Sequence, residues 1–130
     1  MFAVLPKDFD TQGMTAFPLA AFEARDFIMP AQGFDKDIMR IFNRVGVKPH
    51  ILPTWVDDPT VISMVSHGLG VSMMTELTLR GRGDGVLLVP VEPKSARELG
   101  MAVRAGEGRQ ASLQQFLECA QTVLTELEPK

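Results

Sequence analysis

The hydrophobic residues of this chain occur as short runs that alternate with helical stripes. Each run has the length of a buried β-strand. We predict strands at residues 2–5, 27–29, 71–74, 86–91 and 99–104, and an edge strand at 50–56, where Pro53 removes a donor. Stripes with apolar residues three or four positions apart predict helices at residues 19–25, 38–45, 58–69 and 112–127. Strands that alternate with helices are typical of an α/β fold.

Polar residues indicate where several helices begin. Asp58 is predicted to cap a helix with Pro59 in its first turn, and Thr75 to cap a short helix. Ser112 and Gln115 have the spacing of a capping box. The last helix must dock its apolar stripe on something apolar, and the stripe consists of Leu113, Phe116, Leu117, Ala120, Val123, Leu124 and Leu127.

The composition excludes several classes of protein. With 130 residues, 45% of them hydrophobic, the chain can form one compact domain or one and a half small lobes. Its 16 acidic residues outnumber 13 scattered basic ones, so this piece alone is not expected to bind nucleic acid. No apolar stretch approaches the roughly 20 residues of a membrane span. Cys119 is the only cysteine, and we expect an inert packed thiol in a reduced cytoplasm.

The sequence PAQGF, residues 30–34, is the first candidate binding site. It stands between a predicted strand end and a helix start, where open α/β sheets bind small molecules. Gly33 lets a ligand approach the helix amides, which favour a carboxylate, while Gln32 offers a hydrogen bond and Phe34 an apolar wall. An alternative remains open, in which Gly33 only makes a turn and Asp35 caps its own helix.

Other polar residues do not form an expected catalytic or metal site. Asp57 and Asp58 could be a catalytic pair, but neighbours in sequence point apart, and capping explains Asp58. His50 and His67 lack companions at metal-ligand spacing. We expect His67 at a helix C-terminus and His50 at a solvent-facing strand start, and we predict no metal, no cofactor and no enzymatic activity.

Several stretches, in this order, resemble the effector-binding domain of LysR-type bacterial transcriptional regulators. The clearest is DDPTVISMVSHGLGVSMMTEL, residues 57–77, which is similar to that family's capped helix, glycine pair and buried strand. FIMPAQGFDKDIMRIFNRVGVKP, residues 27–49, is the second, and FAVLPKD, LGMAVR and the last helix also fit. Each motif alone occurs in many α/β proteins, so their joint order carries the resemblance.

The resemblance implies a type 2 periplasmic-binding-protein-like fold, with two α/β lobes joined by crossover strands around an effector cleft. FAVL and GMAV would be the crossovers. Residues 1–105 would form the second lobe, with a mixed sheet flanked by helices, and residues 106–130 a loop and C-terminal helix of the incomplete first lobe. The implied effector-binding residues are Pro30, Gln32, Gly33 and Phe34, with Val71, Ser72 and Met73 close behind them and Thr60 near a crossover.

The chain also departs from the family. Phe9 stands where a histidine is common, and Thr75 where a proline is common. The family's N-terminal winged helix-turn-helix and most of the first lobe are absent, so we expect DNA contact only through a missing domain. The last helix should then be uncovered, which predicts a homodimer or higher homo-oligomer.

The interpretation that follows is a sensor domain whose effector is a small organic acid. By population shift, an effector bridging two lobes would favour one lobe orientation. Three alternatives remain: a solute-binding protein of a transport system, an enzyme such as a dehydratase on the same fold, and a protein-interaction fragment without a ligand.

Overall fold

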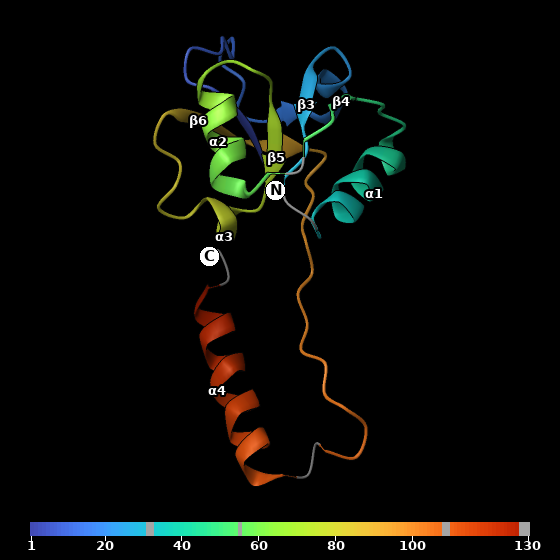
Figure 1. The fold of residues 1–130 in the computed structure, drawn as a ribbon, viewed down its shortest axis with the longest axis vertical. Helices are drawn as coiled ribbons and strands as arrows, with labels where there is room; N and C mark the ends of the chain where they lie inside the picture. The colour runs from blue at the N-terminus through green and yellow to red at the C-terminus, as the bar shows by residue number, and fades with distance from the viewer. Residues whose placement is uncertain (31–32, 55, 108–109, 128–130) are drawn as a thin grey trace. The chain divides into compact units, whose positions relative to one another are not determined.

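The chain consists of two units, Met1–Arg97 and Glu98–Lys130. The computed structural model describes residues 1–30, 33–54, 56–107 and 110–127 (Figure 1). The strands are β1 (Phe2–Pro6), β2 (Phe17–Pro18), β3 (Asp26–Ile28), β4 (His50–Leu52), β5 (Ser72–Met74) and β6 (Val86–Glu92). The helices are a 3-10 turn, η1 (Leu19–Phe22), and α1 (Asp35–Val45), α2 (Asp58–Ser66), α3 (Glu76–Leu79) and α4 (Ala111–Leu127).

A mixed sheet forms the centre of the first unit. Its strand order is β2-β6-β1-β5, with β1 antiparallel to β5 and β6, and β2 parallel to β6. Strands β3 and β4 form a parallel pair, which an isolated bridge between Phe27 and Val71 places beside β5. The predicted mixed α/β sheet is confirmed, and the strand interrupted before Pro53 does lie at an edge.

Both faces of the sheet are buried, which explains why its strands are continuous apolar runs. Ala3 and Leu5 of β1 belong to one core cluster and Val4, between them, to the other, as the two-residue period of a strand requires. Apolar residues of α1 complete the first cluster and those of α2 the second. The two helices therefore cover opposite faces of the sheet.

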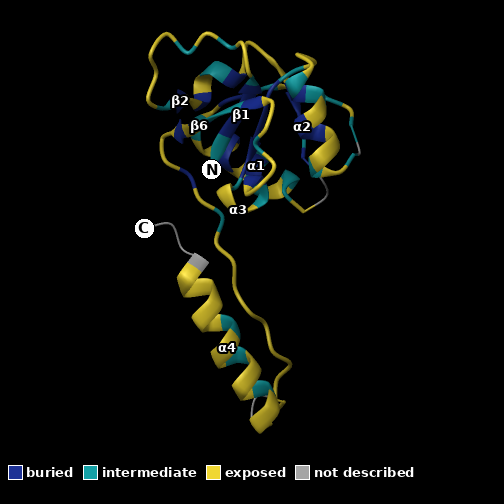
Figure 2. Ribbon diagram, turned by 90° about the vertical axis from the view of Figure 1, so that its left-hand side faces the viewer, coloured by how far each residue is buried: buried dark blue, intermediate teal, exposed yellow. Residues whose placement is uncertain are grey.

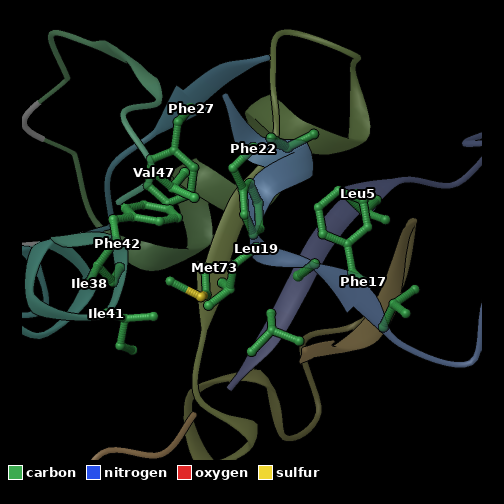
Figure 3. Close-up of a cluster of buried hydrophobic side chains, with 14 residues drawn as sticks. Leu5, Phe17, Leu19, Phe22, Phe27, Ile38, Ile41, Phe42, Val47 and Met73 are labelled. Atoms are coloured by element: carbon green, nitrogen blue, oxygen red, sulfur yellow. The ribbon is translucent and has the colours of Figure 1, made fainter. Parts of the chain in front are cut away.

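Three phenylalanine rings fix how α1 approaches β3. Phe22 of η1, Phe27 of β3 and Phe42 of α1 pack edge to face, with ring centroids 5.4, 5.5 and 5.2 Å apart (Figure 3). All three are fully buried. Edge-to-face pairs of this kind add to the stabilisation from burial. The loop between β3 and α1, which holds the candidate site, is thus anchored at both ends.

The start of α2 differs by one residue from the prediction. Asp57, not Asp58, is the N-cap: its carboxylate accepts the Thr60 N–H at 2.9 Å, and Pro59 lies in the first turn. The reason is that both aspartates precede the proline, and the cap requires an extended backbone, which Asp57 has. The helix was predicted to run to residue 69 and to include Leu69 in its apolar stripe; it ends at Ser66, and Leu69 is exposed.

The second unit departs most from prediction. Residues 99–104 form no strand, and Leu99, Met101 and Val103 are exposed. A strand needs a neighbour to pair with, and none is present among the described residues. The capping box is also wrong, because α4 begins at Ala111 and Ser112 lies inside it.

Helix α4 is largely exposed along its length (Figure 2). Cys119, predicted as a packed thiol, is exposed too. The thiol is exposed because the apolar stripe beside it is itself largely open to solvent. None of the described helices is both long and apolar enough to cross a membrane.

Candidate functional site

The carboxyl ends of β3 and β4 bring the candidate loops to one side of the sheet. The two strands run parallel; β3 leads into α1 and β4 leads into α2. Both helices therefore begin at the same edge, as Figure 1 shows. Edges of this kind are where open α/β sheets bind ligands.

Gly33 has the backbone conformation that the candidate loop requires. Its φ of 104° is a value that residues with side chains rarely adopt, and a Cβ here would meet nothing within 4 Å. Its N–H donates to Asp35 Oδ1 at 3.2 Å. Asp35 thus accepts a hydrogen bond from one amide of the loop. This is part of the alternative in which Asp35, and not a ligand, occupies the amides before the helix. Pro30 is buried, and Gln32 lies outside the described residues.

Phe34 is the N-cap residue of α1, and its side chain makes no capping hydrogen bond. The half-buried ring lies under the guanidinium of Arg97, whose Cζ is 4.3 Å from the ring centroid. Arg97 Nε is also 3.0 Å from Asp37 Oδ2 in the first turn of the helix. The apolar wall predicted at Phe34 therefore carries a cation on its face.

Arg97 and Asp37 were missed by the sequence analysis. They are 60 positions apart, and no local pattern joins Arg97, in the polar connection after β6, to the start of α1. Lys and Arg residues in such connections are common and usually solvated. Only folding brings this arginine to the candidate loop.

Val71, Ser72 and Met73 lie beneath the surface beside β3. All three are buried. The Ser72 hydroxyl donates to the carbonyl oxygen of Ile28 at 2.7 Å, the last residue of β3. Val71 and Ser72 thus hold β3 by hydrogen bonds, and Met73 packs in the same core cluster as Phe27.

Thr60 lies in the first turn of α2, exposed, and interacts with Asp57. Hydrogen bonds from the Thr60 side chain and backbone hold the pKa of the Asp57 carboxyl below its ordinary value, because they stabilise the charged form. Thr60 is therefore already engaged in the N-cap of α2.

The histidines have local partners. His67 is the C-cap residue of α2, with Nδ1 2.8 Å from the Ser63 carbonyl oxygen, and exposed His50 begins β4, with Nδ1 2.6 Å from Asp26 Oδ1. Both placements were predicted. Among the described residues there is no group of three or more His, Cys, Asp or Glu side chains that could hold a metal ion.

A shallow hollow of about 220 Å³ lies elsewhere, at the amino end of β3. Within it the Arg25 guanidinium stands 4.6 Å from the centroid of the Phe9 ring. No pattern in the sequence predicted this hollow, which is lined by Pro6, Phe9, Ala24, Arg25, Asp26, Gly68, Leu69, Gly70 and Val71.

Several solved structures of regulatory and effector-binding domains share this fold. The Synechocystis PCC6803 CcmR regulatory domain in complex with 2-PG is similar with a TM-score of 0.75 and 18% identity, over 99% of this chain and 64% of that one. The effector binding domain of QuiR in complex with shikimate has the same TM-score and identity, over 97% and 61%. HinK, a LysR family transcriptional regulator from Pseudomonas aeruginosa, has a TM-score of 0.66 and 19% identity, over 95% and 44%.

This chain thus spans less than two thirds of the length of those structures. A search of curated protein sequences finds no match. The family model described as "LysR substrate binding domain" matches residues 1–125. The chain therefore belongs to the LysR substrate-binding domain family.

Proposed function

We propose that this chain is the sensing part of a LysR-type transcriptional regulator in the cytoplasm, that it binds a small organic acid, and that it is not an enzyme. The family match over residues 1–125 supports a binding role. Two similar regulatory domains carry small molecules in their structures, 2-PG and shikimate, of which shikimate is an organic acid.

The observation that carries the choice of ligand is the cation on Phe34. Arg97 and the first-turn amides of α1 supply positive charge, while the ring supplies apolar surface. A molecule with one acidic group and a carbon frame matches this pair of features. Pro30, Gln32 and Gly33 complete the proposed loop, with Val71, Ser72, Met73 and Thr60 as proposed supporting residues.

The test is a titration of the whole chain with shikimate and with benzoate, followed by ¹H–¹⁵N NMR. We expect shifts of the Gly33 and Phe34 amides at millimolar ligand, and a loss of binding in Phe34→Ala. Leu77→Ala is the matched control, because Leu77 is an exposed apolar residue of α3. Equal ligand shifts in Phe34→Ala and in the wild type would contradict the proposed site.

We propose further that the chain associates with itself. Apolar residues of the second unit are exposed in both of its segments: Leu99, Met101 and Val103 before α4, and Phe116, Val123 and Leu124 within it. An apolar stripe left in water favours association. DNA contact would require a separate domain of the regulator.

A further inference from the structure

We propose that Arg97 is the specificity-determining residue of the candidate site, and that its guanidinium pairs with the acid group of the effector. This inference rests on the proposed function, because it names the charge partner within that site. It assigns the role to a residue from the connection after β6, outside the loop that the sequence pattern indicates.

The charges around Asp37 are unbalanced. Arg97 Nε lies 3.0 Å from Asp37 Oδ2, and Arg40 Nη1 lies 3.1 Å from Asp37 Oδ1. One carboxylate is thus shared by two guanidinium groups, so these three side chains carry one net positive charge. The Asp35 carboxylate of the same turn accepts the Gly33 N–H, so the positive side of this cluster lies at the two arginines.

The two arginines differ in their surroundings. The Arg40 side chain is 78% exposed, so water and salt screen its charge. The Arg97 side chain is 28% exposed and its guanidinium covers the Phe34 ring. Electrostatic interactions strengthen as a charge leaves water. Arg97 is therefore the cation on which an anionic ligand gains most.

The geometry of Arg97 suits a carboxylate. A guanidinium has five N–H donors in a planar fork, and Nε accounts for one of them in the contact with Asp37. Contact with the Phe34 ring restricts the motion of the guanidinium, which lowers the entropy lost when a ligand binds. The ligand class that follows is a monocarboxylate with an apolar frame, and its neutral amide should be rejected.

The experiment uses the intact 130-residue chain and compares benzoate with benzamide by ¹H–¹⁵N NMR, which includes the Arg97 Nε–H signal. Benzoate should shift this signal and the Gly33 and Phe34 amides; benzamide, of the same shape without the charge, should not. Arg97→Gln should weaken benzoate binding about tenfold or more, since a charged hydrogen bond is lost. Arg97→Lys, which keeps the charge but loses the fork, should fall between.

Arg40→Gln is the matched control, because it removes the other arginine from the same carboxylate. We expect its effect on benzoate affinity to stay below about threefold, as for an exposed pair. Equal losses in Arg40→Gln and Arg97→Gln would overturn the assignment, since they would show only the effect of net charge.

Asp37→Asn separates ligand pairing from a merely structural ion pair. If Arg97 binds the ligand, removal of the competing carboxylate should raise benzoate affinity. If the Arg97–Asp37 ion pair only holds Phe34 in place, Asp37→Asn and Arg97→Gln should both lower the benzoate affinity. That result would show that the assignment is wrong.

The inference and the proposed function can fail separately. Undiminished benzoate shifts at Gly33 and Phe34 in Arg97→Gln would leave the proposed site standing and refute the role of Arg97. If neither benzoate nor shikimate shifts any amide of residues 33–37 at millimolar concentration, the proposed function fails and the inference fails with it.

Discussion

Close backbone contact at Gly70 shows how one residue holds the loop before β5 against β3. A Cβ at this position would lie 2.7 Å from the Asp26 carbonyl oxygen and 3.1 Å from Ile28 Cγ1. The first neighbour is backbone and cannot move alone. Hydrogen bonds on either side, from Val71 N–H to the Asp26 oxygen and from Ile28 N–H to the Val71 oxygen, depend on this approach.

We therefore expect Gly70→Ala to destabilise the fold by about 1–3 kcal/mol, the usual cost of inserting a methyl group into a tight contact. Urea unfolding followed by circular dichroism measures it. The matched control is Gly100→Ala, where a Cβ would meet nothing within 4 Å. This control should change stability by no more than about 0.5 kcal/mol. An unchanged Gly70→Ala midpoint would show that the two segments are not so close.

Buried Ser72, two residues after Gly70, also supports β3. Its hydroxyl donates to the Ile28 carbonyl oxygen at 2.7 Å. Ser72→Ala leaves that buried acceptor with one bond fewer, which we expect to cost about 1–3 kcal/mol in urea unfolding. Ser66→Ala is the control: it removes an exposed hydroxyl that donates to the Ser63 carbonyl oxygen, and it should be close to neutral. Similar effects of both substitutions would argue against a special role for Ser72.

At the scale of elements, the cap of α2 links helix stability to pH. Hydrogen bonds from Thr60 lower the pKa of Asp57 in the folded protein relative to its ordinary value of 3.8. The unfolded chain therefore takes up this proton at a higher pH than the folded chain does. The stabilisation from Asp57 is complete above 3.8 and is lost as the pH falls through the lowered pKa.

Asp57→Asn should keep the cap but remove this proton uptake, so the decline of the urea midpoint below pH 4 becomes shallower. Asp57→Ala should lower the midpoint at neutral pH as well, because the cap itself is gone. Asp84→Asn, in an exposed loop, is the control and should leave the acid branch unchanged. If the urea midpoint of Asp57→Asn falls below pH 4 as steeply as that of the wild type, this account is contradicted.

For the whole molecule, the distribution of exposed apolar residues is the main feature. The first unit buries two clusters on either side of its sheet, whereas α4 of the second unit exposes Phe116 to 65%. An unpaired extended segment and an uncovered amphipathic helix both have unused surface for another chain.

We expect the chain to sediment as a dimer or larger species at high concentration, and Phe116→Glu to shift it toward monomer. The reason is that a charge would have to be buried in the apolar contact. Gln115→Glu adds the same charge beside it on a face that helical periodicity turns away from the stripe. A strictly monomeric wild type, or an equal effect of both variants, would count against self-association.

Local patterns in the sequence determined much of the first unit. Buried strands could be located from residues such as Ala3, Val4 and Leu5, because a strand covered on both faces needs an unbroken apolar run. Gly33 could be recognised as a turn before a helix, since backbone conformation depends on the residue itself and its neighbours. The resemblance of the whole chain supplied the family.

Only the tertiary structure decided which distant residues meet. The contact of Arg97 with Phe34 and Asp37 joins segments about 60 positions apart, and no short-range rule encodes such a contact. The strand expected at residues 99–104 failed for the same reason: a sequence can favour an extended backbone, but a strand exists only where a neighbouring strand receives its hydrogen bonds.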